Sequence, residues 1–391
     1  MSTMFWDKTL WGLLLAVLLM MIGVGMIVAV LPQQIVYLDG SGHSVGYLAS
    51  TFAFAYILLQ VPVGRLSDKL GCKPFLIIGY VLCFFAGLEY FFATSSGVIF
   101  FARLLQGAGE VPVWALAPAL LSVKFPMHKG KVMGIYNAAM HLGLTLGPIL
   151  GIVLAQMLNR NEVFLVYSFC CLAGAGVITL LVESPRKKEI KTTSSLDFQN
   201  IFKLIGQRHT FISLIGITLY GAGYGIFLTI IPTFLLQEKA LSAVGIGVFF
   251  SLFYVAISFS QIITGPLSDR FGRRIFMIIG LLIAAGGITI TPVLSMPFIL
   301  LALTVTSLGL GVFYLASMGF LNEIVPAHLK GTISGAYYFF WGIGMFFGPP
   351  VMTQIATSIS FQASMASYAF LILLVAVGMM NRLRSKAVID K

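Results

Sequence analysis

The chain has few charged residues. Asp, Glu, Lys and Arg make up only 9% of its 391 residues, whereas soluble domains carry about 25%. This scarcity excludes an ordinary soluble protein, and the 59% share of hydrophobic residues points the same way. Cysteine is scarce too, with four residues that do not make a disulfide framework. We expect them to be small packing residues.

The sequence also lacks the motifs that carry enzyme chemistry. No zinc-ligand spacing, nucleophile elbow or phosphate-binding loop occurs in it. A membrane-embedded enzyme would need a cluster of catalytic groups, and a receptor would need a soluble output domain. The sequence has neither, so we expect no enzyme, no metal and no organic cofactor.

Long apolar runs make up most of the chain. A transmembrane helix needs about 20 such residues, and twelve runs reach that length. Because irregular backbone cannot face lipid, each run is expected to be a helix. The twelve ranges are 10–32, 44–64, 74–93, 97–123, 131–157, 162–182, 210–236, 242–266, 275–293, 297–322, 331–356 and 362–381.

The basic residues between these runs are unevenly distributed. With the N-terminus inside, 21 of the 24 Lys and Arg fall on the inner side, and only Arg160 and Lys239 fall outside. This bias predicts a multi-pass protein of the cell (inner) membrane with both termini in the cytoplasm. A nucleic-acid partner would need a basic face on a soluble domain, so the net charge of +11 does not indicate one. The first apolar run is too long for a cleavable signal peptide and is read as the first span.

One pattern occurs twice, 201 residues apart. GRLSDKLGCK begins at Gly64 and GPLSDRFGRR begins at Gly265, and the same offset relates Gly147 to Gly348. Two alike apolar halves are typical of transporters, in which the substrate path lies at the interface of the repeats.

The repeat and the apolar runs together predict the fold. We expect an all-α membrane protein with twelve transmembrane helices in two pseudo-symmetric six-helix bundles. The bundles should comprise residues 1–182 and 210–391, and the long polar stretch 183–209 should be a cytoplasmic linker between them.

Each copy of the repeated pattern places glycines, an Asp and basic residues between two predicted spans. Glycine permits a tight turn with positive φ, Asp can accept hydrogen bonds from a helix N-terminus, and Lys and Arg can bond to carboxylates and helix carbonyls. We expect a latch that holds one conformation and releases another. The alternative is that the basic residues only set the topology. The latch residues are Gly64, Asp68, Gly71, Lys73, Gly265, Asp269, Gly272, Arg273 and Arg274.

Two charges fall inside the predicted helix 97–123. Arg103 and Glu110 are seven residues apart, which is nearly two turns, so they share one face that Trp114 continues. A charge in hydrocarbon costs about 3 kcal/mol on insertion scales, so this face should line a cavity. A carboxylate partly out of water can exchange protons near neutral pH. The alternative is a structural ion pair that fastens this helix to its neighbours.

The predicted helix 131–157 contains GLTLGPILG. Proline can bend a helix, and glycines four residues apart allow close helix contact. His141 on the same helix is a second candidate for moving protons, or else simply a hydrogen-bonded core residue. Together with the latch residues, four residues of this helix are predicted to act in the conformational change: Gly143, Gly147, Pro148 and Gly151.

Aromatic residues with polar tips gather on three predicted helices of the second half. Such side chains suit an amphipathic ligand, although packing and lipid-facing roles stay open. The predicted cavity residues are Trp114, Tyr220, Tyr224, Tyr314, Tyr337 and Trp341.

The repeated pattern resembles the signature G-x-L-x-D-x-x-G-[RK]-[RK] of the major facilitator superfamily. The signature fits in full from Gly265, and from Gly64 with Cys72 in place of the first basic residue. The resemblance covers all twelve spans. It implies a monomer with two six-helix bundles around a central cavity that opens alternately to each side.

Two shorter motifs resemble branches of that superfamily. Arg103-x-x-Gln-Gly-x-Gly looks like the helix-4 motif of proton-coupled facilitators, and with Glu110 it is similar to spinster-like lipid transporters and sialin-like organic-anion symporters. By this resemblance Glu110 is the leading proton site and Arg103 its partner. Both branches carry a charge in the first helix, whereas residues 10–32 contain none. GLTLGPILG resembles the helix-5 motif of drug:proton antiporters.

These features predict a proton-coupled secondary active transporter that exports amphipathic small molecules by alternating access. Its partners would be protons, a small-molecule substrate and the lipid bilayer. The rival hypothesis is a proton-coupled symporter or facilitator of organic anions or lysolipids, in which Arg103 meets the anionic group.

Overall fold

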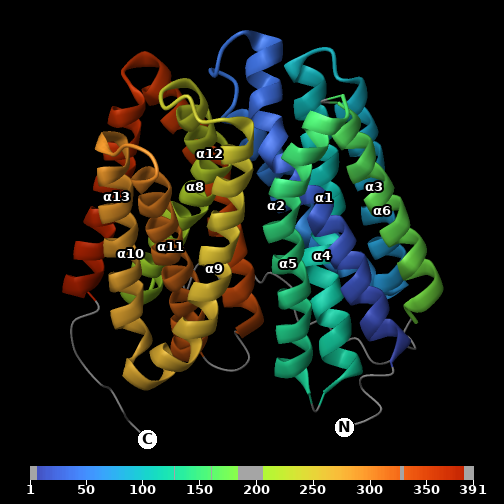
Figure 1. Cartoon of the computed structure of the whole chain (residues 1–391). Coiled ribbons are helices and arrows are strands. Elements are labelled where there is room, and N and C mark those ends of the chain that lie inside the picture. The colour runs from blue at the N-terminus through green and yellow to red at the C-terminus, as the bar shows by residue number, and fades with distance from the viewer. Residues whose placement is uncertain (1–6, 127, 160, 184–205, 326–329, 383–391) are drawn as a thin grey trace, which may run out of the picture. The chain divides into compact units, whose positions relative to one another are not determined.

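The computed structural model shows an all-α chain. It describes residues 7–126, 128–159, 161–183, 206–325 and 330–382, without side-chain positions for residues 68, 129–131, 330–332 and 382. This part of the chain forms twelve α-helices and one short 3-10 turn, and it contains no strand (Figure 1).

The helices are long and separated by short connections. Their bounds are α1 (Lys8–Asp39), α2 (Tyr47–Leu70), α3 (Cys72–Phe92), α4 (Ser96–Lys124), α5 (Lys129–Met157), α6 (Glu162–Leu181), α8 (Arg208–Gln237), α9 (Ala243–Phe271), α10 (Arg273–Ile290), α11 (Phe298–Ile324), α12 (Lys330–Ser358) and α13 (Phe361–Arg382), with the 3-10 turn η2 at Thr291–Val293.

Each of the twelve predicted spans corresponds to one of these helices, and the predicted fold class is confirmed. Within the described ranges, eleven of the helices are long and apolar enough to cross a membrane. The twelfth, α12, has 29 residues, but its glycines, tyrosines and two prolines make it less apolar than the rest.

The structure corrects one expectation about the repeated pattern. The sequence predicts that each copy lies between two helices, but α2 continues to Leu70 and α9 continues to Phe271. Only Gly71 and Gly272 form the turn, with φ values of 87° and 94° that favour glycine. Hydropathy locates only the apolar part of a helix, and here each helix continues into a polar end, through Gly64 in α2 and through Gly265 and Pro266 in α9.

The chain forms two compact units. One takes its described residues from 1–195, 225–255 and 349–353, and the other from 196–224, 256–348 and 354–391. The predicted linker at 183–209 lies mostly outside the described residues, so the expected domain division stays a prediction.

Helix packing inside the two units follows the sequence repeat. In the first unit α3 packs against α4 and α6, and in the second α10 packs against α11 and α13 (Figure 1). Since α10, α11 and α13 are the repeat counterparts of α3, α4 and α6, the internal packing repeats as the sequence does.

Glycine allows close contact between α1 and α5 in the first unit. A Cβ atom built on Gly147 would lie 2.7 Å from Cα of Gly25 and 2.9 Å from the backbone nitrogen of Met26. In the second unit, a Cβ on Gly348 of α12 would lie 2.8 Å from Cα of Ala222 on α8. The close contact predicted for the helix 131–157 is therefore present, and its partner is α1. A Cβ on Gly143 or Gly151 would meet α1 in the same way, and Pro148 lies beside Gly25.

Candidate functional site

A chain of hydrogen bonds runs along one face of α4. Nη1 of Arg103 donates to Oε1 of Gln106 at 2.9 Å, and Nε2 of Gln106 donates to Oε1 of Glu110 at 2.8 Å. The indole Nε1 of Trp114 donates to Oε2 of Glu110 at 3.0 Å. Steps of three and four residues place these side chains on one face of the helix. The structure thus brings together Arg103, Glu110 and Trp114 as predicted, with Gln106 as their link.

The chain of hydrogen bonds is buried at one end and partly open at the other. Arg103, Gln106 and Glu110 are 4%, 0% and 2% exposed, whereas Trp114 is half-buried. Buried charges need hydrogen-bond partners to be tolerated. Both carboxylate oxygens of Glu110 have one, so the carboxylate is well accommodated inside the first unit.

Neighbouring helices hold the Arg103 end of the chain. Nε of Arg103 donates to the carbonyl of Leu48 at 3.0 Å, and the guanidinium lies 5.3 Å from the centre of the Phe52 ring on α2. The hydroxyl of Tyr90 on α3 donates to Oε1 of Gln106 at 2.7 Å. Sequence reasoning missed these partners because they come from other helices. Arg103 and Glu110 are joined through Gln106 rather than by a direct ion pair.

His141 lies apart from this chain of hydrogen bonds. Its Nδ1 atom is buried and has no hydrogen-bond partner within the described ranges. No hydrogen bond within the described residues joins His141 to Glu110, which accepts from Gln106 and Trp114, and a role for His141 in moving protons stays a prediction.

Five of the six predicted cavity residues form one aromatic cluster in the second unit. The ring centre of Tyr220 lies 5.3 Å from that of Tyr314 and 6.4 Å from that of Tyr224. Tyr224 lies 5.9 Å from Trp341, and Tyr314 lies 5.9 Å from Tyr337. The hydroxyl of Tyr337 is bonded to the carbonyl of Tyr314 at 3.3 Å. The sixth residue, Trp114, belongs to the first unit beside Glu110.

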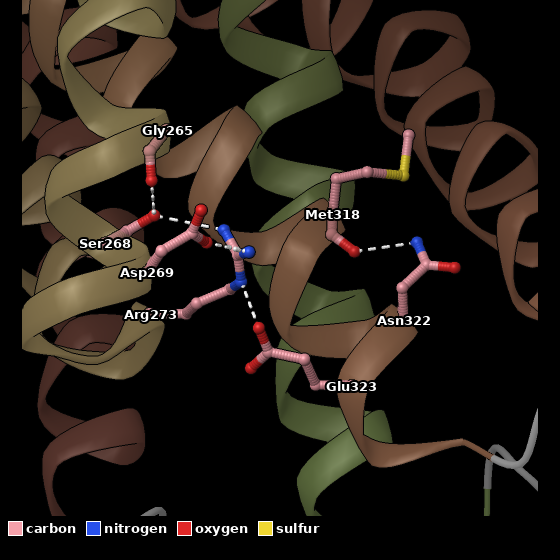
Figure 2. Close-up of polar contacts among 7 residues, drawn as sticks. All are labelled: Gly265, Ser268, Asp269, Arg273, Met318, Asn322 and Glu323. Atoms are coloured by element: carbon pink, nitrogen blue, oxygen red, sulfur yellow. Dashed lines mark hydrogen bonds and ion pairs between the residues drawn. The ribbon is translucent and has the colours of Figure 1, made fainter. Parts of the chain in front are cut away.

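The latch residues of the second repeat form a compact polar network (Figure 2). The guanidinium of Arg273 pairs with Asp269 on α9 and with Glu323 at the end of α11. Its Nη1 also donates to Oγ of Ser268 at 3.0 Å, and this hydroxyl donates to the carbonyl of Gly265 at 3.2 Å. Arg273 thereby joins the ends of α9, α10 and α11. Next to Glu323, the side chain of Asn322 bonds to its own helix at the carbonyl of Met318.

The first repeat keeps only part of this network. Ser67 donates to the carbonyl of Gly64 at 2.7 Å, as Ser268 does to Gly265. The 201-residue offset places Cys72 and Ser122 where the second repeat has Arg273 and Glu323. Cys72 is fully buried. The side chain of Asp68 lies outside the described residues, so its role in the latch stays a prediction.

A glycine makes room for Arg273 in the second repeat. A Cβ on Gly319 would lie 2.5 Å from Cδ and Cζ of Arg273. The offset places Pro118 at the corresponding position of the first repeat. An arginine at position 72 would meet the proline ring there, which agrees with the cysteine found instead.

The second basic residue of each pattern makes the same contact in both repeats. Nζ of Lys73 donates to the carbonyl of Thr179 at 2.9 Å, and Nη2 of Arg274 donates to the carbonyl of Met380 at 3.3 Å. Positions 179 and 380 are related by the same offset of 201 and lie in the last turns of α6 and α13. Such carbonyls lack partners inside their own helix, and a cation there also complements the helix dipole. These residues therefore fasten the third helix of each repeat to its sixth.

A second ionic cluster in the first unit was missed by sequence reasoning. Nζ of Lys124, in the last turn of α4, lies 2.9 Å from Asp7 and 3.0 Å from Glu183. It also donates to Oγ1 of Thr9 at 2.6 Å. The sequence showed Lys124 only as one of many basic loop residues, and its partners are 117 and 59 positions away. The cluster ties together the ends of α1, α4 and α6.

No group of three His, Cys, Asp or Glu side chains converges as a metal site in the part of the chain that the structure describes. The buried polar residues of the candidate site are bonded to one another.

A family model supports the resemblance read from the motifs. The model described as Major Facilitator Superfamily matches residues 13–242 and again residues 213–389. The two matches overlap over residues 213–242 and between them cover nearly the whole chain.

Individual relatives extend this result. The chain is 27% identical over 352 residues to Multidrug resistance protein 1 of Bacillus subtilis, covering 87% of this chain and 88% of the relative. It is 26% identical over 339 residues to an uncharacterized MFS-type transporter of Methanocaldococcus jannaschii, covering 84% and 86%. Among solved structures, a point mutant of the nucleoside transporter NupG superposes with a TM-score of 0.85 at 15% identity, covering 96% of this chain and all of that one.

Proposed function

Because the chain belongs to the Major Facilitator Superfamily, we propose that it is a proton-coupled exporter of amphipathic small molecules. Membership makes it a multi-pass membrane transporter of small molecules and not an enzyme. The proposal adds the coupling ion, the direction of transport and the chemical class of the substrate. It also places the protein in the cell (inner) membrane with both termini in the cytoplasm.

The observation that carries the proposal is the setting of Glu110. This carboxylate is buried, yet within the described ranges no cation contacts it directly, because Gln106 lies between it and Arg103. A direct ion pair would hold the carboxylate in its charged form. With a neutral amide in between, both the charged and the neutral forms are accessible, as a coupling site requires.

In the proposed cycle, Glu110 takes up a proton from the outside. The protein then closes and reopens towards the cytoplasm, where the proton leaves as substrate binds. The repeated latch holds one of the two conformations. A shift between two states needs only a difference of a few kcal/mol in their free energies, so one proton and one substrate are sufficient to drive the change.

The contacts of Arg103 count against the rival hypothesis. A symporter of organic anions would need its guanidinium free to meet the anionic group. Arg103 is 4% exposed, and its bonds go to Leu48 and Gln106 while its plane lies over Phe52. An anion would have to displace these partners, so we prefer a role for Arg103 as the distant counter-charge of Glu110.

Three observations support the export of amphipathic molecules. The chain is similar to a protein named for multidrug resistance, and its α5 carries the glycines and proline that resemble the antiporter motif. In the aromatic cluster Tyr220 and Tyr337 are buried. The half-buried side chains of Tyr224, Tyr314 and Trp341 offer ring faces with hydroxyl and indole groups at their edges. Such a surface suits flat apolar molecules with one polar group.

Flux measurements test this proposal. Purified protein in liposomes should move ethidium, a fluorescent amphipathic cation, when a pH gradient is imposed across the membrane. Ethidium should move against the proton flow, and collapse of the gradient with an ionophore should stop its accumulation. Ethidium that moves together with protons would instead indicate a symporter, and flux without any dependence on the gradient would rule out proton coupling.

A further inference from the structure

Glu110 accepts its two hydrogen bonds from groups that act only as donors. An indole N–H has no acceptor atom, so Trp114 can only donate to Oε2. Gln106 faces Oε1 with its amino group. The arrangement therefore fits the ionised carboxylate, which is an acceptor at both oxygens.

The amide of Gln106 cannot simply turn over. Its Oε1 accepts from Nη1 of Arg103 at 2.9 Å and from the hydroxyl of Tyr90 at 2.7 Å. A flipped amide would present its amino group to the guanidinium, which has only donors. Arg103 thus fixes the orientation of Gln106, and Gln106 in turn presents a donor to Glu110.

Protonation of Glu110 upsets this arrangement. The new O–H is a donor, and neither Gln106 Nε2 nor Trp114 Nε1 can accept from it. Both existing bonds also lose their charge assistance, which makes them about half as strong. One of the two contacts must weaken when the carboxylate becomes neutral.

The contact to Trp114 is the one free to change. Gln106 is fully buried and held by three hydrogen bonds. Trp114 is half-buried and makes its bond from the partly open end of the α4 face. We propose that Trp114 is a positioning residue that reports the protonation state of Glu110: its indole is bonded to the ionised carboxylate and is released when the carboxylate binds a proton. This inference rests on the proposed function, in which Glu110 carries the coupled proton.

Other titratable groups surround Glu110. Tyr80 and Tyr90 on α3 and Tyr167 on α6 interact with its charge, and Cys83, Cys171 and Tyr136 lie next to these tyrosines. Tyrosine and cysteine ordinarily titrate above neutral pH, and an arginine side chain is not deprotonated in proteins. Residues 10–32 of α1 contain no titratable acid or base. Histidine ordinarily changes its charge between about pH 5 and pH 8, so the test must separate His141 on α5 from Glu110.

Fluorescence of Trp114 provides that test. In the full chain, Trp6, Trp11 and Trp341 are replaced by Phe, which leaves Trp114 as the single tryptophan. Its emission and its quenching by acrylamide are followed from about pH 5 to about pH 8. We expect stronger quenching and a shift to longer wavelength at the acidic end, and we expect both changes to vanish when Glu110→Gln is added. A chain that keeps only Trp11, which is 54% exposed on α1, is the matched control and should not respond.

The outcomes separate this inference from the proposed function. If the fluorescence of Trp114 still responds to pH in Glu110→Gln, the response comes from another titrating group, and His141 is the first candidate. This outcome would overturn the inference. Trp114 fluorescence that does not change with pH would also overturn the inference. If ethidium transport by that protein still depends on Glu110, the proposed function would stand without the inference. Should the single-tryptophan protein fail to fold, Trp114→Phe in the natural sequence gives the second readout. This variant keeps an aromatic side chain but loses the indole N–H that bonds to Oε2, and it should flatten the pH profile of ethidium transport; an unaltered profile would refute the inference.

Discussion

Gln106 places its amide Nε2 2.8 Å from Oε1 of Glu110, so a neutral side chain separates the buried carboxylate from Arg103. In this arrangement the arginine influences the acid without neutralising it by contact. The distance between the two charges is set by one residue, and changes at position 106 should therefore alter coupling more than they alter the fold class.

Gln106→Leu is predicted to uncouple transport and to lower stability. It leaves the hydroxyl of Tyr90, Nη1 of Arg103 and Oε1 of Glu110 each without a partner. Each unsatisfied buried polar group costs about 1–3 kcal/mol, so Tm should fall clearly. The matched control is Gln33→Leu on α1, whose side chain bonds only within its own helix, to the carbonyl of Ala29. Equal Tm and equal gradient-driven flux in the two variants would contradict the role given to Gln106.

Gly319→Ala is predicted to break the latch without removing any charge. The new Cβ would lie 2.5 Å from Cδ and Cζ of Arg273 and would push the guanidinium away from Asp269 and Glu323. Arg273 is flexible at that end and surface ion pairs contribute about 0–1 kcal/mol, so Tm should change little. Transport should fall, and we expect Asp269→Asn to lower it in the same way. Gly286→Ala on α10, where a Cβ meets open space, is the control. Wild-type flux in Gly319→Ala would mean that the Arg273 network does not act as a latch.

Asp68→Asn is predicted to impair transport while the protein stays folded and inserted. Asp68 corresponds to Asp269, but the first repeat has Cys72 and Ser122 where the second has its arginine and glutamate. We therefore expect the first repeat to depend on Asp68 more heavily than the second depends on Asp269. Transport by well-expressed Asp68→Asn is compared with transport by Asp39→Asn, which changes the same charge at an exposed helix end. Equal transport rates in Asp68→Asn and Asp39→Asn would show that Asp68 does not act in the latch.

Gly147→Ala is predicted to destabilise the first unit, and Gly147→Leu to stop the cycle. A Cβ at this position would lie 2.7 Å from Cα of Gly25, where backbone cannot yield as a side chain does. Gly134 lies on the same helix, and a Cβ built there has open space around it. Gly134→Ala should therefore raise the free energy of unfolding by about 0.5–1 kcal/mol through helix propensity alone. Thermal denaturation of the pair checks this. A Gly147→Ala variant as stable as Gly134→Ala would show that α1 and α5 do not need close contact.

Features that depend on one helix or on the repeat could be read from the sequence. Apolar run length located the twelve helices, and helical spacing placed Arg103, Glu110 and Trp114 on one face of α4. The offset of 201 residues identified Gly71 and Gly272 as equivalent, and both have positive φ.

Contacts between helices could not be read in the same way. Leu48 and Tyr90 complete the site from α2 and α3, and Lys124 meets Asp7 and Glu183 only because three helix ends converge. Spacing along the sequence carries no information on such pairs. Helix ends were also misjudged, because α2 and α9 continue as helices beyond their apolar parts.

Gradient-driven transport by Glu110→Gln tests the central claim most directly. The substitution keeps the size of the side chain but removes the titratable group, and like the protonated acid it turns one of the two acceptors into a donor. In liposomes with an imposed pH gradient, this variant should not accumulate ethidium against its gradient. It should still exchange ethidium across the membrane without a pH gradient, because the conformational change no longer waits for a proton. Accumulation at the wild-type rate would place the coupling proton elsewhere and would contradict the account.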